Sequence, residues 1–120
     1  MKHTPLQDVL TVTKAMADTQ RVRILLLLRD GELCVCQIVA VLRLATSTVS
    51  KHLSILAAAG LVKARRDGRW SYYQLAPGQR ALRWMHDDLK HDEQIRADRS
   101  ALGKIRKQSL EVLCRQQRPN

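Results

Sequence analysis

The sequence predicts a mainly α-helical domain that carries one β-hairpin. Hydrophobic residues make up 45% of the 120 residues, while aromatic residues make up 3% and phenylalanine is absent. Leu, Val, Ile and Ala must therefore fill the core, and cores of this composition usually form between packed helices. The hairpin is predicted by Asp67–Gly68, a dipeptide typical of tight turns, which lies between two segments of strand-favouring residues. A chain of this length is expected to form one domain.

Apolar residues at helical spacing predict four helices before the hairpin. Their ranges are 6–18, 20–29, 33–42 and 46–59, with the third starting at residue 33 or 34. Pro5 suits the start of the first helix, Thr19 can cap the second, and Thr46 or Ser47 can cap the fourth. Gly60 suits the end of the fourth helix, because a left-handed residue commonly terminates a helix.

The remaining elements complete the order of a winged helix-turn-helix. The hairpin is predicted over about 61–75, a helix from about 79 to the low nineties, and a further helical pattern over 100–113. In this fold the helix at 46–59 is the recognition helix and the hairpin is the wing. The helix-turn-helix then covers about 33–59, and the C-terminal helix and tail cover about 79–120.

The charge of the chain points to a polyanionic partner. The formal net charge is +10, from 21 Lys and Arg against 11 Asp and Glu. A small, strongly basic domain most often binds nucleic acid, although a solvated basic surface would give the same composition. The sequence contains no run of 18 apolar residues and no signal-peptide pattern. We therefore expect no membrane partner and a cytoplasmic location.

One face of the predicted recognition helix carries side chains suited to DNA. Small hydroxyl groups allow close approach to base edges, and lysine adds positive charge against phosphates. The candidate DNA-binding residues of this helix are Thr46, Ser47, Thr48, Ser50, Lys51, His52 and Ser54. An ordinary solvated face more often carries Glu and Lys pairs, whereas no acidic residue occurs from position 33 to position 66. The pattern therefore favours DNA binding.

The predicted wing is also basic. Its candidate DNA-binding residues are Arg65, Arg66 and Arg69. They surround the single acid Asp67 at the hairpin tip, where they could hold phosphates or enter the minor groove. Trp70, Tyr72 and Tyr73 could stack on bases, but alternating aromatic residues on a strand more often pack against the core or across strands. We expect packing.

Four segments of the chain together resemble the ArsR/SmtB family of winged-helix repressors. They are KAMADTQRVRILLLL at 14–28, GELCVCQIVAVL at 31–42, STVSKHLSILAAAGLV at 47–62 and RRDGRWSYYQL at 65–75. The segment ELCVC in particular resembles the arsenic- and antimony-responsive branch of that family. The resemblance implies a homodimer, formed through the first and last helices, that binds double-stranded operator DNA. It also implies release from DNA when a trivalent metalloid binds cysteine thiolates.

The three cysteines are the candidate inducer site. The resemblance implies that Cys34 and Cys36 bind As(III) or Sb(III), with Val39 standing where branch members carry a third cysteine. Because soft centres prefer thiolates, we expect Cys114, either of the same chain or of the second chain in a dimer, to complete a three-thiolate site. The alternative is a two-thiolate site completed by a small external thiol or by water, with Cys114 as a core residue.

Two other functions use the same residues. A repressor of the same fold could respond to oxidation of Cys34 and Cys36, or to another metal. A thiol oxidoreductase would need a Cys-x-x-Cys motif, which the sequence lacks, so we expect no enzyme. An odd number of cysteines in a reducing compartment also predicts that the chain has no disulfide framework.

The spacing of Cys34 and Cys36 has a mechanical consequence. Residues two apart on an α-helix point about 200° apart, whereas in an extended chain they point the same way. If both cysteines lie on the third helix, chelation must unwind or displace its start. This movement would misalign the neighbouring recognition helix and lower the affinity for DNA.

Overall fold

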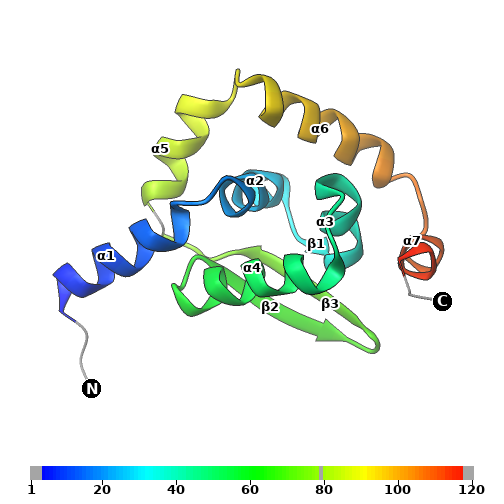
Figure 1. Ribbon diagram of the computed structural model, residues 1–120, viewed down its shortest axis with the longest axis horizontal. Helices are drawn as coiled ribbons and strands as arrows, with labels where there is room; N and C mark the ends of the chain where they lie inside the picture. The colour runs from blue at the N-terminus through cyan, green and yellow to red at the C-terminus, as the bar shows by residue number, and fades with distance from the viewer. Residues whose placement is uncertain (1–3, 79, 118–120) are drawn as a thin grey trace.

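The computed structural model describes residues 4–78 and 80–117 and shows a helical body with one projecting β-hairpin (Figure 1). The helices within these ranges are α1 (Pro5–Met16), α2 (Thr19–Leu27), η1 (a 3-10 turn, Leu28–Asp30), α3 (Val35–Leu42), α4 (Thr46–Ala58), α5 (Arg80–Leu89), α6 (Glu93–Ile105) and α7 (Leu110–Gln116). The strands are β1 (Leu33–Cys34), β2 (Val62–Asp67) and β3 (Trp70–Leu75). The predicted fold class, mainly α with a β-hairpin wing, is confirmed. No helix in the described ranges has the length and apolar character needed to cross a membrane.

The core lies between α2, α3, α4 and the small sheet. Every residue from 24 to 28 is buried, so the end of α2 and the start of η1 are enclosed on all sides. One stripe of α4, formed by Val49, Leu53 and Leu56, has no exposed surface. Because these residues follow helical spacing, they bury one face of α4 and leave the opposite face in solvent.

The three strands form an antiparallel sheet in the order β1–β3–β2. The predicted hairpin turn is confirmed, and Gly68 has a φ of 60°, which glycine adopts without strain. The structure adds β1, whose residues the sequence placed at the start of a helix. Cys34 pairs with Tyr72, and the residue before it pairs with Tyr73. A strand of two residues is too short to give an alternating pattern, so sequence periodicity cannot detect it.

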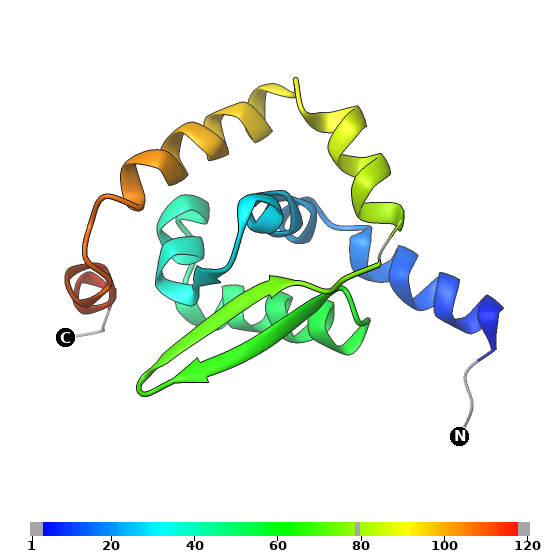
Figure 2. The same cartoon turned by 180° about the vertical axis from the view of Figure 1, so that it is seen from behind.

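The C-terminal helices arch over the body of the domain. α5 and α6 pass over α2 and α3, and α7 lies beside α3, at the opposite end of the molecule from α1 (Figures 1 and 2). The predicted helix at 100–113 is wrong at both ends. α6 already begins after Asp92, whose carboxylate accepts hydrogen bonds from two N–H groups of the first turn. α7 is a separate helix that begins after Ser109, whose hydroxyl accepts a hydrogen bond from the N–H of Val112 at 3.2 Å.

A largely buried ion pair holds α6 against α2. Arg23 Nε donates to Asp98 Oδ2 at 2.8 Å, and Arg23 Nη2 donates to Asp98 Oδ1 at 2.9 Å. The side chains are only 13% and 5% exposed, and Gln94 donates a further hydrogen bond to Asp98. Hydrogen bonding to Asp98 raises the pKa of Arg23 above its usual value. The pair therefore fixes the arch that carries α7.

Replacing Asp98 with alanine should lower the free energy of unfolding by about 3 kcal/mol, because the Arg23 guanidinium loses its counter-charge in a largely buried position. Urea unfolding of Asp98→Ala and of the wild-type protein measures the difference. Asp88→Ala removes an exposed acid from α5 and should change the free energy by less than about 0.5 kcal/mol. A loss below about 1 kcal/mol for Asp98→Ala would show that the pair does not hold α6 in place.

Candidate nucleic-acid interface and thiol site

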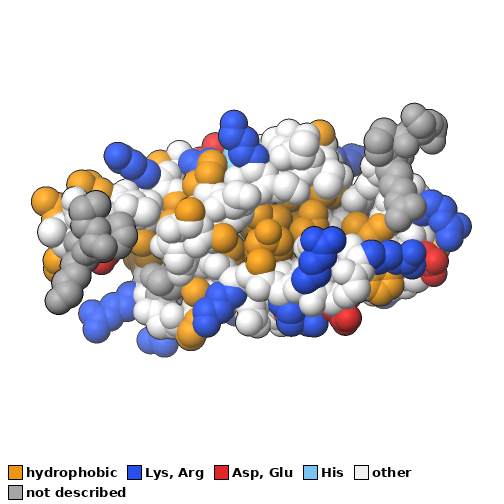
Figure 3. Space-filling view, turned by 90° about the horizontal axis from the view of Figure 1, so that it is seen from below, with side chains coloured by type: hydrophobic (Ala, Val, Ile, Leu, Met, Phe, Trp, Pro, Cys, Tyr) orange, Lys and Arg blue, Asp and Glu red, His pale blue; other side chains and the backbone are white. Residues whose placement is uncertain are grey.

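The recognition helix α4 presents its polar face to solvent. Six of its seven candidate residues are exposed, namely Thr46, Ser47, Thr48, Ser50, Lys51 and Ser54. The N-cap position is Ala45, so the predicted cap by Thr46 or Ser47 is wrong and neither hydroxyl is used in that way. Lys and Arg side chains are spread across the side of the molecule that carries α4 and the hairpin, with few acidic side chains among them (Figure 3). This surface has the charge and the small polar groups that suit DNA.

The seventh candidate, His52, also helps to position α4. Its side chain is half-buried, and its Nδ1 lies 3.3 Å from Nη1 of Arg21 on α2. Arg21 in turn donates from Nε to the carbonyl oxygen of Ala15, near the end of α1, at 2.6 Å. Arg21 and His52 therefore join three helices beside the polar face of α4. The sequence offered no signal for Arg21, because it lies in a helix whose pattern is dominated by core residues.

Arg65 of the wing is bound by Glu32, which lies two residues before Cys34. Its Nε donates to Glu32 Oε2 at 3.0 Å, and its guanidinium carbon lies 4.6 Å from the centre of the Tyr72 ring. The hydrogen bond from Arg65 lowers the pKa of Glu32 below its usual value. Tyr73, which follows Tyr72 on β3, packs against the core as expected.

The hairpin tip carries the other two candidate arginines. Arg66 Nε donates to the carbonyl oxygen of Gly68 at 3.4 Å, within the turn itself. Arg69 Nη2 donates to Glu111 Oε1 of α7 at 3.3 Å, and its guanidinium carbon lies 5.2 Å from the Trp70 ring centre. In this conformation Arg69 is therefore bound to the C-terminal helix. The sequence did not predict that contact.

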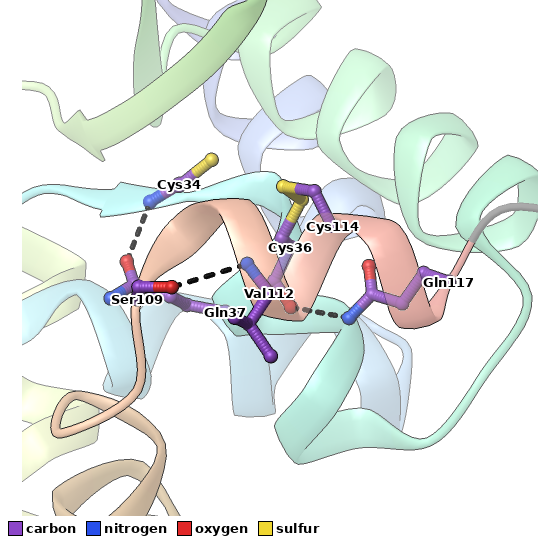
Figure 4. Close-up of a disulfide and its surroundings, with 7 residues drawn as sticks. All are labelled: Cys34, Cys36, Gln37, Ser109, Val112, Cys114 and Gln117. Atoms are coloured by element: carbon purple, nitrogen blue, oxygen red, sulfur yellow. Dashed lines mark hydrogen bonds between the residues drawn. A yellow bond between two sulfur atoms is a disulfide. The ribbon is translucent and has the colours of Figure 1, made fainter.

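The three cysteines come together from three different elements. Cys34 ends β1, Cys36 lies in the first turn of α3, and Cys114 lies on α7. Their sulfur atoms all lie within 4.8 Å of one another and point toward a common centre (Figure 4). They form the one group of His, Cys, Asp and Glu side chains in the described ranges that could hold a metal ion. We call these residues the thiol site.

A disulfide joins Cys36 to Cys114, with a Cα–Cα distance of 5.4 Å, and leaves Cys34 as a buried free thiol. The sequence predicted that the chain has no disulfide framework, whereas the structure contains this disulfide. The pairing depends on α7, which brings a residue 78 positions away to the distance that a disulfide requires. Reduction of this bond yields three neighbouring thiols, and its formation leaves one.

The expected unwinding of α3 is not needed to bring the sulfurs together. Cys34 is extended, with φ of −74° and ψ of 148°, while the helix starts at Val35. The Gln37 side chain fixes this junction, because its Oε1 accepts a hydrogen bond from the N–H of Cys34 at 2.9 Å. One cysteine in a strand and one in a helix therefore replace the opposed arrangement that the spacing implies on a continuous helix.

The thiol site lies beside both elements of the candidate DNA interface, α4 and the hairpin. A cavity of about 300 Å³ adjoins the three cysteines, and its other lining residues are Val35, Thr46, Ser50, Arg69, Trp70 and Ser71. Two of these belong to α4 and three to the hairpin. A movement of the cysteine side chains could therefore alter the positions of residues in the candidate DNA interface directly.

Together, a helix-turn-helix with an exposed polar second helix and a basic hairpin define the class of winged-helix DNA-binding proteins. Residues 18–64 match the family model described as bacterial regulatory protein, arsR family. The chain is 43% identical over 76 residues to the arsenic resistance transcriptional regulator ArsR1 of Pseudomonas putida. The aligned segment covers 60% of this chain and 59% of that protein. It is 42% identical over 69 residues to a cadmium resistance transcriptional regulatory protein CadC homolog of Staphylococcus aureus. This aligned segment covers 57% of this chain and 57% of that protein.

A solved structure shows the same fold. It is the homodimeric winged helix-turn-helix DNA-binding domain of a possible ArsR-family transcriptional regulator from Mycobacterium bovis. The identity is 33% and the TM-score 0.61, over 73% of this chain and 88% of that one. The chain therefore belongs to the ArsR family, whose members are transcriptional regulators and not enzymes. It spans little more than half the length of the two curated relatives above.

Proposed function

We propose that this protein is a metalloid-responsive repressor. It binds operator DNA as a homodimer and leaves the DNA when As(III) or Sb(III) binds the thiolates of Cys34, Cys36 and Cys114. The observation that carries this proposal is the convergence of three sulfurs within 4.8 Å beside α4 and the hairpin. For comparison, thiolates about 2.3 Å from a zinc ion lie roughly 3.8 Å apart, so small side-chain rotations suffice to close the site around one ion.

The chemistry of the donor set supports a soft ligand. Thiolates select soft metal and metalloid centres over hard cations such as Mg²⁺. The P. putida relative is named for arsenic resistance, and the S. aureus relative is named for cadmium resistance. A trivalent metalloid fits three sulfur donors without a further ligand, and this favours arsenic or antimony over cadmium here. Binding requires that the Cys36–Cys114 bond be reduced first.

Exposed apolar side chains support the homodimer. On α1, Leu6, Val9 and Leu10 are 68%, 58% and 48% exposed, and on α5 Trp84 is 61% exposed. Large exposed apolar side chains that cluster on a surface mark interaction sites. A two-fold pairing through α1 and the C-terminal helices would cover them and place two α4 helices on half-sites about one helical turn apart.

The disulfide favours a second candidate function, the sensing of oxidants. Two thiols, at Cys36 and Cys114, would give two electrons and two protons to an oxidant such as hydrogen peroxide, which becomes water. The disulfide that forms would then take the place of the metalloid as the signal for release. This candidate uses the same fold and the same DNA interface.

Release from DNA separates the two candidates. The reduced protein is bound to a labelled duplex selected from a random pool, and either arsenite or hydrogen peroxide is added in one gel-shift series. Release by arsenite, with the reductant kept present, supports the metalloid repressor. Release by peroxide alone supports the oxidant sensor. If neither agent releases the DNA, both candidates are wrong.

Lys51→Ala should weaken DNA binding about tenfold and lower the slope of log Kd against log salt by about 1, because one phosphate contact is lost. Fluorescence anisotropy at several salt concentrations measures both quantities. Lys104→Ala, which removes an exposed lysine from α6, is the matched control and should leave the slope unchanged. Equal effects of the two variants would show that Lys51 acts only through net charge. Lys2→Ala should likewise barely change DNA binding, although Lys2 lies outside the described residues.

A further inference from the structure

The C-terminal helix α7 connects the thiol site to the tip of the wing. Cys114 is bonded to Cys36 of α3, and Glu111 accepts the 3.3 Å hydrogen bond from Arg69 of the hairpin. Residues 111 and 114 are three apart, which places them on adjoining faces of a helix about one turn apart. A cavity of about 100 Å³ between the wing and α7 is lined by Arg69, Trp70, Glu111, Cys114 and Arg115. A displacement of Cys114 therefore displaces Glu111 as well.

The position of α7 depends on the thiol site. The helix has seven residues, whereas an isolated helix needs about 12–15 residues to be even marginally stable in water. Of its residues only Leu113 is buried. The links from this end of the chain to α3 include the Cys36–Cys114 bond and a hydrogen bond from Gln117 Nε2 to the carbonyl oxygen of Cys36 at 2.8 Å (Figure 4). Opening the link between the sulfurs therefore removes the strongest of these ties.

We propose that Glu111 is a positioning residue that sequesters Arg69 whenever Cys114 is tied to Cys36. Glu111 and a DNA phosphate compete for the same guanidinium, and the carboxylate also repels phosphates nearby. The tie is either the disulfide or a metalloid ion shared by the two sulfurs. When the tie opens, α7 leaves the wing and Arg69 becomes available to DNA. Reduction by a dithiol opens the disulfide with two electrons and two protons, and the dithiol itself becomes a disulfide.

This coupling rests on the proposed function, because it assumes that the hairpin lies on DNA. Under either candidate function the signal would act in the same direction, since a bound metalloid and the disulfide would each hold α7 against the wing. The size of the effect is limited by exposure. The Arg69 and Glu111 side chains are 61% and 58% exposed, so their pairing should change the DNA affinity by about two- to fivefold.

Glu111→Gln tests the proposal because it removes the charge and keeps the size of the side chain. In protein with the Cys36–Cys114 bond formed, we expect the substitution to raise the affinity for duplex DNA about two- to fivefold. It should also steepen the slope of log Kd against log salt by about 0.9, the value of one added phosphate contact. After reduction with dithiothreitol, wild-type and Glu111→Gln protein should bind equally well. Fluorescence anisotropy with a labelled duplex selected from a random pool gives all of these values.

Two controls keep the result specific. Glu93→Gln removes an exposed acid from α6 and should change neither the affinity nor the slope beyond the effect of net charge. In an Arg69→Ala background, Glu111→Gln should lose most of its effect, because only the 3.9 Å ion pair of Glu111 with Arg115 and the repulsion between the carboxylate and phosphates remain. Equal gains from Glu111→Gln and Glu93→Gln would overturn the proposal, as would a gain that persists after reduction. If the proposed function itself fails, reduced wild-type protein will not bind DNA or arsenite will not release it, whichever residue stands at position 111.

Discussion

Reduced protein carrying Cys36→Ser should stay on its DNA at arsenite concentrations that release the wild-type protein. Cys36 lies within 4.8 Å of both other sulfurs, and it is the residue through which α7 is tied to α3. A serine oxygen is a hard donor and binds a soft metalloid weakly. We expect the arsenite concentration for half release to rise at least about 100-fold, which corresponds to about 2.7 kcal/mol.

Ser71→Ala is the matched control for this measurement. Ser71 lines the cavity beside the thiol site, but its substitution leaves all three sulfurs in place. The variant should be released at the wild-type arsenite concentration in the same anisotropy titration. Release of Cys36→Ser at that concentration would mean that the thiol site does not receive the inducer.

A second substitution, Ser50→Asp, should abolish specific DNA binding without unfolding the protein. Ser50 is exposed on α4, outside the stripe of Val49, Leu53 and Leu56 that fills the core. A carboxylate at this point would face phosphates and base acceptors, and like charges brought together at an interface cost several kcal/mol. We expect the affinity to fall at least about 100-fold, as measured by fluorescence anisotropy.

Ser100→Asp supplies the same change in net charge at an exposed position of α6. Because mobile ions screen charges that are more than about 10 Å apart at moderate salt, this control should lose less than about threefold in affinity. Circular dichroism should give the same spectrum for both variants and the wild-type protein. If Ser50→Asp binds within threefold of Ser100→Asp, α4 does not read the DNA.

The elements of the candidate DNA interface could be predicted from local sequence signals. The spacing of Val49, Leu53 and Leu56 located α4 to within one residue at its C-terminal end. In an amphipathic helix the apolar residues recur at helical spacing, so the sequence itself indicates which face is buried. Asp67–Gly68 located the hairpin turn, because few other dipeptides adopt that backbone conformation. These signals act between neighbouring residues, and no tertiary contact is needed to interpret them.

The thiol site could be predicted only in its composition. Val39, which stands at the expected position of a third cysteine, is 6% exposed and belongs to the core, so that position supplies no ligand. Cys114 reaches the site because α6 and α7 are separate helices joined by a turn, and the Arg23–Asp98 pair holds the arch in place. Such long-range packing leaves no periodic signal in the sequence. The tie between Arg69 and Glu111 was missed for the same reason.

X-ray absorption at the arsenic edge tests the three-thiolate site most directly, because it counts the sulfur atoms around the bound arsenic. The sample is reduced protein loaded with one equivalent of arsenite, alongside Cys114→Ser prepared in the same way. A site built from Cys34, Cys36 and Cys114 predicts three sulfur neighbours and no oxygen in the wild-type protein. It predicts two sulfurs and one oxygen in Cys114→Ser. A wild-type spectrum with an oxygen neighbour, or one that Cys114→Ser leaves unchanged, would contradict the three-thiolate site.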